Sequence, residues 1–588
     1  MRVRQFTAAA AALLLAAGLG GCSDSPAPVR PPTPTPEPVP KATASTGDVR
    51  PADRVDIADG GVLRWAVDQV PATLNVYQPA ATADSALLAH ALYPSLFRPD
   101  EHGRPVPDPD YLAGAESTPP GQQPQVVTYR LNPQAVWSDG TPLSVADFTA
   151  QRAALARLDP AYDAIDAIAE GADPREIKVT FRRPYAEWQS LFGPLYPAAE
   201  TATAASFNRA LVGGAHLTAG PYTVSQYNTE DGRVTVGRNP RWWGDRPKID
   251  RIDFLATPPE RRLDDLDQER LDIAPLTAAV DRAVPAASSG SPSAAAVPPA
   301  AAPEAAALAL KWAESLPDVT VHRAAAPSLT QLTVNAARGP LTDPALRLAL
   351  GRAVDRRRIA EAALGPLGLP GAPLGSHLLA GDQEGYRDNS AAASPATVAQ
   401  LLDGAGWTRP NGGTRVKDGK ELSLSLLVPA GSATAKRTAD ALTANLAESG
   451  IAVKPVTAPT DTFVKDHLAA GDFDLALFSW PAGPNPASQQ RAVYAKPRPD
   501  ADGAVKSGSN YARSGTEEID RLFDRAAAEL DPAARLDLLQ EADVRIWQLG
   551  HSVPLYQRPD LVGVRTGVVG AGAWGFGWPR FQDIGWSG

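Results

Sequence analysis

Strands and helices alternate along the C-terminal half of this 588-residue chain, and this alternation limits the folds available to it. Residues 422–428, 452–456 and 473–480 have the apolar pattern of strands, whereas residues 438–448 and 343–359 repeat apolar residues at helical spacing. The order strand, helix, strand predicts α/β units built around a parallel sheet. The fold class expected from the sequence is therefore α/β.

Turns and caps divide the N-terminal half into shorter elements. Asp139-Gly140 marks a tight turn, Ser144 is suited to cap the helix that follows, and Asp231-Gly232 predicts a hairpin between residues 220–224 and 233–236. Further strands are expected at residues 61–67, 126–131, 177–181, 252–255 and 332–335, with a short last strand at 553–556 before a glycine- and tryptophan-rich tail. Further helices are expected at residues 83–96, 304–316 and 517–549.

Composition and charge exclude several classes of function. The formal net charge is −10 with arginine dispersed along the chain, so no basic stripe predicts nucleic-acid binding. The seven histidines include no His pair at i, i+4 with a neighbouring Glu, and neither a Gly-x-Ser-x-Gly elbow nor a phosphate-binding glycine loop is present. We therefore expect no enzyme activity, no cofactor and no metal site.

The first sixty residues predict export and attachment to a membrane. Arg2 and Arg4 precede an apolar stretch, residues 6–19, that suits a signal peptide. The stretch ends in Leu-Gly-Gly-Cys at Cys22, the only cysteine of the chain, and this resembles a bacterial lipobox in which the cysteine is lipidated. The proline-rich residues that follow favour a semi-rigid spacer of ~3.1 Å per residue.

Seven segments resemble one known family, and they occur in the family's order. They are PATLN (71–75), VWSDGTPLSVADF (136–148), AGPYTV (219–224), RNPRWWGDRPKIDRIDF (238–254), LRLALGRAVDRRRI (346–359), GDFDLALFSW (471–480) and VPLY (553–556). The chain is thus identified as a member of the peptide- and nickel-type extracellular solute-binding proteins of ABC importers, family 5. We expect core packing for Trp137, Trp242 and Trp243 in these segments.

The resemblance implies a type II periplasmic-binding-protein fold, with two lobes, a hinge and an extra domain, three domains in all. The implied division is signal peptide 1–21, lipidated tether 22–59, lobe I 60–95 with 215–325 and 553–588, extra domain 96–214, and lobe II 326–552; a low-complexity insertion falls at about 283–303. A ligand would bind between the lobes, and closure of the hinge would be the signal that a permease reads.

The ligand-binding residues implied by the resemblance follow one lobe strand. Trp480 aligns with a pocket-lining tryptophan, and Pro481, Ala482, Gly483 and Asn485 follow it. Relatives that bind free peptides place an Asp at the position of Gly483, where it pairs with the peptide's α-amino group. Because a buried ammonium needs such a partner, free peptides become doubtful ligands. Trp480 is expected to stack on the ligand or to pack in the core.

The implied function is that of an extracytoplasmic substrate-binding lipoprotein of an ABC transporter, anchored to the outer face of the cell membrane through Cys22. Its expected partners are a peptide-like or other small solute and an ABC permease, and the protein is expected to be a monomer. Residues 97–100, 184–192 and 546–547 also resemble an actinobacterial branch tied to cell-envelope lipoglycan assembly. A lipoglycan-assembly regulator or a glycolipid-binding protein on the same fold is therefore the alternative.

Overall fold

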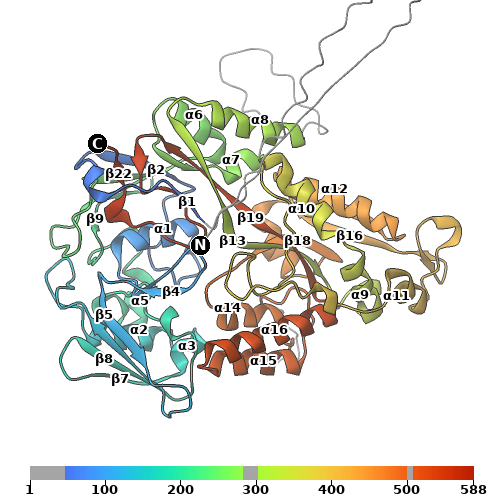
Figure 1. The fold of residues 1–588 in the computed structure, drawn as a ribbon, viewed down its shortest axis with the longest axis horizontal. Coiled ribbons are helices and arrows are strands. Elements are labelled where there is room, and N and C mark those ends of the chain that lie inside the picture. Colours follow the sequence, from blue (N-terminus) through green and yellow to red (C-terminus); the bar gives the residue numbers. More distant parts are fainter. Residues whose placement is uncertain (1–46, 283–301, 499–507) are drawn as a thin grey trace, which may run out of the picture. The chain divides into compact units, whose positions relative to one another are not determined.

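A ten-stranded mixed sheet is the main feature of the computed structural model (Figure 1). Its strands lie in the order β17 (Ala452–Ala458), β16 (Ser423–Pro429), β18 (Leu475–Pro481), β13 (Val319–Val334), β19 (Ser552–Arg565), β12 (Ile273–Pro275), β2 (Val62–Val67), β11 (Arg251–Ala256), β10 (Arg233–Arg238) and β9 (Tyr222–Asn228). We call β12, β2, β11, β10 and β9 the N-terminal half-sheet, and β17, β16 and β18 the C-terminal half-sheet. This sheet confirms the α/β class.

The structure describes residues 47–282, 302–498 and 508–588, which lie in one unit, Ala42–Gly588. The predicted signal peptide, Cys22, residues 22–46 of the predicted tether and residues 283–301 of the predicted insertion fall outside these residues, whereas residues 47–59 of the predicted tether are described and include a strand that pairs with the C-terminal tail. Within the described ranges, no helix is long and apolar enough to cross a membrane.

Two long strands, β13 and β19, connect the half-sheets. They pair with each other in antiparallel fashion over most of their lengths, while β18 pairs with the second part of β13 and β12 with the second part of β19. The pairing shifts register between Ala325 and Leu329, next to the predicted lobe boundary at 325/326. The division into lobes stays a prediction, and this irregular crossing is where a hinge is expected.

The predicted strands at 332–335 and 553–556 were far too short, because β13 and β19 have 16 and 14 residues. Their remaining residues carry weak strand signals: Ala324 to Ala326 have low strand propensity, and Pro554 and Pro559 lack a backbone donor. Pairing with neighbouring strands overrides these local preferences.

The C-terminal half-sheet confirms the parallel arrangement predicted from the alternating pattern. β16 pairs in parallel with both β17 and β18. Helix α12 (Ala433–Glu448) connects β16 to β17, and Ser432 caps it by accepting a hydrogen bond from Ala435 N at 3.0 Å. Neighbouring residues of β16 face different cores: Leu424, Leu426 and Val428 pack with α12, and Leu427 packs in a separate cluster.

One predicted helix is two helices. Residues 343–359 form α9 (Pro344–Ala353) and the start of α10 (Arg356–Leu364), because Val354 is extended at φ −73° and ψ 112°. Asp355 then caps α10 by accepting a hydrogen bond from Arg358 N at 3.1 Å. The single-helix prediction was wrong because an N-cap aspartate lies inside the apolar repeat.

Three further helices pack against one another in the C-terminal region, and Figure 1 shows them gathered together. They are α14 (Pro486–Tyr494), α15 (Glu517–Ala528) and α16 (Pro532–Leu549). Their shared core contains Tyr494, Phe523 and Ile546. The helical prediction for 517–549 is confirmed, apart from a break around Asp531, which caps α16.

A separate four-stranded antiparallel sheet lies in the N-terminal region. Its order is β5 (Leu112–Ser117), β6 (Val126–Leu131), β8 (Glu176–Phe181) and β7 (Ile165–Glu170), with α2 (Val145–Leu155) and α1 (Ala83–Leu92) nearby in the sequence. Ser144 N donates to Asp147 Oδ2 at 2.9 Å, which confirms the predicted start of α2. Trp137 is buried, and Trp242 and Trp243 pack in part against the same core, as predicted.

The tail after β19 forms strands, which the sequence did not indicate. β20 (Val568–Val569) pairs with β22 (Gly585–Trp586), and β21 (Gly572–Ala573) pairs with β1 (Asp48–Val49) near the start of the described chain. Asp48 also contacts β13, since its Oδ1 lies 2.9 Å from His322 Nδ1 and its Oδ2 accepts from Arg323 N at 2.8 Å. Both ends of the described chain therefore pack against the central strands.

Candidate functional site

A cavity of about 350 Å³ lies where the carboxyl ends of β16 and β17 meet β18. Open α/β sheets bind ligands at this edge. Helix α7 (Thr277–Arg282) and the start of α12 contribute residues to its wall, and we name it the α7–α12 cavity. Its lining residues are Thr277, Ala278, Asp281, Thr330, Leu367, Pro429, Ala430, Gly431, Ser432, Thr434, Ala435, Thr460, Phe463, Val464, Leu477, Phe478, Ser479, Tyr556, Arg558 and Pro559.

Asp281 links the two sides of this cavity. It lies on α7, which precedes β13, and its carboxylate reaches the start of α12 in the C-terminal region. Oδ2 accepts from Ser432 Oγ at 2.5 Å, and Oδ1 accepts from Thr434 N at 2.7 Å. A carboxylate is favoured at a helix N-terminus by the exposed N–H groups and the helix dipole. Asp281 therefore ties α7 to α12 across the cavity.

The cavity wall combines polar and apolar surface. Thr330 Oγ1 and Ser479 Oγ lie 2.9 Å apart, and the hydroxyl of Tyr556 lies 2.9 Å from Thr438 Oγ1. Burial raises the pKa of Tyr556, so its hydroxyl stays protonated at neutral pH. Phe463 and Leu477 supply apolar surface. Such a mixture is typical of sites that bind a small solute by shape and a few directed hydrogen bonds.

Two arginines lie at or behind this wall. Arg558 of β19 lines the cavity and is exposed, and its guanidinium has no hydrogen bond or ion pair within the described parts of the chain. Arg437 of α12 is buried; its Nη2 donates to Thr434 Oγ1 at 2.8 Å, while its Nε and Nη1 have no partner there. Burial lowers the pKa of Arg437, and the charge of Asp281 opposes this effect.

The site residues predicted from the sequence lie beside this cavity rather than around it. Trp480 and Pro481 end β18, directly after the cavity residues Phe478 and Ser479. Ala482 is buried and donates its N–H to Pro327 O at 2.9 Å.

Trp480 is already in contact with another aromatic ring. Its indole stacks on Tyr511 with ring centroids 5.5 Å apart and an interplanar angle of 12°. One indole face is thus covered by the protein, so a ligand would have to use the other face or the ring edge. Its Nε1 is buried without a hydrogen-bond partner in the described structure, so this edge retains a free donor.

The rest of the predicted segment leads to a second cavity of about 420 Å³, which we name the α14–α16 cavity. Asn485 is buried and lines it, and Gly483 O accepts a hydrogen bond from the cavity residue Gln383 at 3.0 Å. The other lining residues are His102, Gly103, Arg104, Pro105, Ala186, Glu187, Gln189, Leu379, Glu384, Pro484, Pro486, Pro532, Ala533, Arg535, Leu536 and Leu539. Residues 480–485 therefore run from one cavity to the other.

Glu187 makes a second contact between distant parts of the chain. This buried residue lies in the N-terminal region, and its carboxylate accepts hydrogen bonds from Ala487 N at 2.8 Å, Ser488 N at 2.9 Å and Ser488 Oγ at 2.5 Å. These groups belong to the first turn of α14. Burial raises the pKa of Glu187, and the hydrogen bonds from Ser488 and Ala487 oppose that shift. Glu187 and Asp281 thus occupy equivalent positions at two helix starts.

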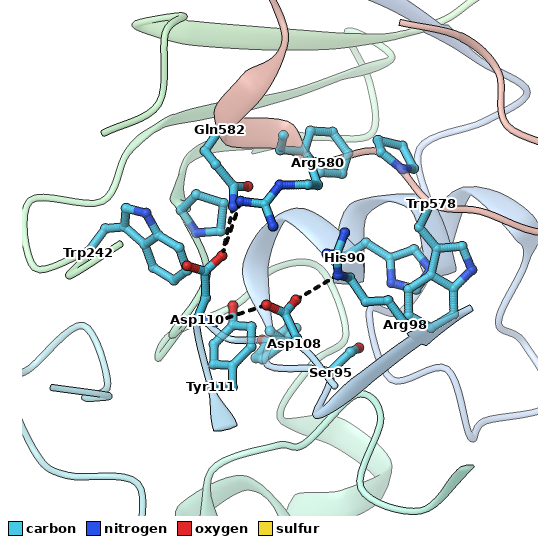
Figure 2. A pocket seen from close by; sticks show the side chains of 14 residues that line it. His90, Ser95, Arg98, Asp108, Asp110, Tyr111, Trp242, Trp578, Arg580 and Gln582 are labelled. Carbon is cyan, nitrogen blue, oxygen red and sulfur yellow. Dashed lines mark hydrogen bonds and ion pairs between the residues drawn. The ribbon is translucent and has the colours of Figure 1, made fainter. Parts of the chain in front are cut away.

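A third pocket lies beneath the C-terminal tail, and Figure 2 shows the side chains that line it. Arg98 pairs with Asp108 at 2.9 Å, Gln582 donates to Asp110 at 2.8 Å, and His90 stacks on Trp578 with centroids 3.9 Å apart. Its volume of about 30 Å³ holds one or two water molecules and no larger solute. The contacts of Gln582 with Asp110 and of Trp578 with His90 attach the C-terminal tail to the N-terminal region.

No sequence pattern selected Asp281, Glu187, Arg437 or Arg558. Asp281 lies two residues before the start of the low-complexity segment, and Glu187 was noticed only as part of a resemblance motif. Their contacts join residues far apart in the chain, which no local pattern reveals. Within the described ranges, no group of three His, Cys, Asp or Glu side chains is arranged to hold a metal ion.

Comparisons with known proteins agree with this fold. Residues 113–502 match the protein family described as "Bacterial extracellular solute-binding proteins, family 5 Middle". Oligopeptide-binding protein OppA of Mycobacterium tuberculosis is 32% identical, over 97% of this chain and 92% of its own. The probable monoacyl phosphatidylinositol tetramannoside-binding protein LpqW of the same species is 24% identical, over 86% and 89%. The solved structure of the periplasmic EDTA-binding protein EppA superposes with a TM-score of 0.74 at 23% identity, covering 94% of this chain and all of that one.

The mixed sheet carries a cavity of small-solute size at the carboxyl ends of its parallel strands. The chain belongs to the bacterial extracellular solute-binding proteins, family 5. It has the type II periplasmic-binding-protein fold and acts as an extracytoplasmic substrate-binding protein of an ABC transporter, with a membrane permease as its partner. This family consists of binding proteins rather than enzymes.

Proposed function

We propose that the solute is peptide-like and that it binds in the α7–α12 cavity. The observation that carries this proposal is the position of the cavity: residues before β13 and residues after it both line it, at the ligand-binding edge of the parallel strands. Bending at the register shift in β13 opens and closes such a cavity. The family relationship to an oligopeptide-binding protein supports the choice of a peptide-like solute.

Trp480, Pro481, Ala482, Gly483 and Asn485 form the segment that connects this cavity to the α14–α16 cavity, and we propose that a longer solute follows it. Gly483 supplies no carboxylate. A Cβ atom built there lies 1.7 Å from Gln489 Oε1, so even a small side chain requires Gln489 to move. The α-amino group of a peptide therefore has no charged partner at this position, and its charge contributes little to affinity.

Free and N-acetylated forms of a random tetrapeptide mixture are expected to bind equally well, within about twofold in Kd, because neither form meets a carboxylate at residue 483. Native mass spectrometry of the purified protein with each mixture measures the bound fraction, and thermal shift gives an independent value. Poly(ethylene glycol) oligomers of similar mass are the control for non-specific occupancy.

Strong preference for the free amino terminus would contradict the interpretation of Gly483, and no binding of either mixture would contradict the peptide assignment. The same assay with phosphatidylinositol mannosides tests the alternative, a glycolipid-binding or lipoglycan-regulating protein, which the similarity to LpqW favours. Binding of the glycolipid alone would select that alternative. We also propose that the protein works as a monomer, which its mass in the peptide-free sample checks.

We propose that a lipid on Cys22 anchors the protein to the outer face of the cell membrane. The apolar stretch, the small residues before the cysteine and the proline-rich spacer after it support this proposal. Cys22→Ser is expected to release most of the protein from the membrane pellet of the expressing cells into the soluble fraction, as measured by immunoblot. Retention of the variant in the pellet after a carbonate wash would show that another feature holds the protein there.

A further inference from the structure

The charged groups around the α7–α12 cavity differ in how far their hydrogen bonds are satisfied. Both oxygens of Asp281 are already bonded, to Ser432 Oγ and Thr434 N. A ligand ammonium can engage this carboxylate only in competition with the cap of α12. The cavity thus offers no free anion among the described residues that line it.

Arg558, unlike Asp281, has unsatisfied hydrogen-bonding groups. Its exposed guanidinium lines the cavity and makes no hydrogen bond or ion pair with any described residue, so its five N–H donors remain available. A planar guanidinium binds a carboxylate through two parallel hydrogen bonds, a geometry that a lysine ammonium does not provide. The group best matched to Arg558 is therefore a carboxylate.

The nearby charges of Asp560 and Arg437 do not remove the preference of Arg558 for a carboxylate. Asp560 lies two residues along β19, but it forms no ion pair with Arg558 within 4.0 Å. Burial raises the pKa of Asp560 to about 6, against the effect of Arg558. Arg437 adds positive charge behind Thr434, without an ion-pair partner in the described structure.

We propose that Arg558 binds a carboxylate of the solute, so that the ligand is a peptide-like molecule fixed in this cavity by an acidic group rather than by its amino terminus. The proposal rests on the proposed peptide-binding function and names its specificity residue. The carboxylate is either the carboxyl terminus of the peptide or an acidic side chain, and the two sources are chemically alike at Arg558.

The test uses four random tetrapeptide mixtures and three variants. The mixtures have a carboxyl-terminal acid or amide, each made with and without Asp and Glu. The variants are Arg558→Gln, Arg558→Lys and, as a matched control, Arg357→Gln, which removes an exposed arginine of α10 outside the cavity. Kd values come from isothermal titration. Because the guanidinium of Arg558 makes no hydrogen bond or ion pair with a described residue, the melting temperature of Arg558→Gln without peptide is expected to equal that of the wild type.

The wild type and Arg357→Gln are expected to bind mixtures that contain a carboxylate about 10- to 100-fold more tightly than the amide mixture without acidic residues. Arg558→Gln loses this difference, and Arg558→Lys retains part of it. Preference for the terminal acid identifies the carboxyl terminus as the anchor, and preference for Asp and Glu identifies a side chain.

Two kinds of result would overturn the proposal, and they separate a failure of the Arg558 assignment from a failure of the peptide-binding function. If the wild type binds all four mixtures equally, or if Arg558→Gln keeps the wild-type preference, Arg558 has no such role and the peptide-binding function stands. If the wild type binds none of the mixtures, the peptide-binding function fails, and the assignment of Arg558 fails with it.

Discussion

Replacing Asp543 by alanine is expected to lower the free energy of unfolding by about 4 kcal/mol. Asp543 lies on α16 and is 1% exposed. Its Oδ1 accepts from His377 N and lies 2.8 Å from His377 Nδ1, and its Oδ2 accepts from Asn389 Nδ2 at 2.6 Å. His377 Nε2 also lies 3.0 Å from Ser552 O, so both ring nitrogens face acceptors. Removing the carboxylate leaves these donors buried without a partner, which is costlier than losing one exposed hydrogen bond.

Urea denaturation followed by circular dichroism measures this change. Asp537→Ala is the matched control, since Asp537 lies exposed on the same helix and its replacement is expected to change stability by less than about 0.5 kcal/mol. If Asp543→Ala unfolds at the same urea concentration as the control, the His377–Asp543–Asn389 cluster does not stabilise the attachment of α16.

Replacing Glu187 by alanine is expected to lower the free energy of unfolding by about 3 kcal/mol and to loosen the start of α14. The buried carboxylate accepts three hydrogen bonds, from Ala487 N, Ser488 N and Ser488 Oγ, which the small alanine side chain cannot replace. The two backbone N–H groups then lose their partner. Because Glu187 and α14 lie on different sides of the α14–α16 cavity, separation of these sides is expected as well.

Hydrogen–deuterium exchange at the peptide that contains Ala487 and Ser488 measures the local effect, and urea denaturation measures the global one. Glu170→Ala, an exposed glutamate of β7, is the control. Unchanged exchange at α14 in Glu187→Ala would show that other contacts hold these elements together.

The fold was predictable from the sequence wherever local pattern and final structure agree. The strand–helix–strand run that became β16, α12 and β17 is an example, because each element has its own apolar pattern, although α12 begins at Ala433 and was predicted only from residue 438. The strands β13 and β19 were predicted too short, since Pro554 and Pro559 weaken the local signal while pairing with neighbours decides the structure. The break between α9 and α10 depends on Asp355, whose capping role competes with an apolar repeat that continues through it.

The candidate site was predictable only in part. The residues from Trp480 to Asn485 came from a resemblance, and the structure places them between two cavities. Asp281 and Arg558 were not found, because a lone charged residue beside a low-complexity segment or after a strand signal has no distinguishing pattern. Their significance depends on the presence or absence of partners in space: Asp281 is hydrogen-bonded to the start of α12, and the guanidinium of Arg558 has no hydrogen bond or ion pair with a described residue.

The contacts of Asp48 determine which part of the fold would resist a force applied at the start of the described chain. Asp48 is held by His322 and Arg323 of β13 and pairs with β21, all within the part of the molecule that precedes the register shift at Ala325 or packs against it. A pull applied at residue 47 is therefore borne by this side of the crossing. Residues 328–334, beyond the register shift, make none of these contacts with Asp48, so bending at the shift is expected to leave the side that bears α12 free to move.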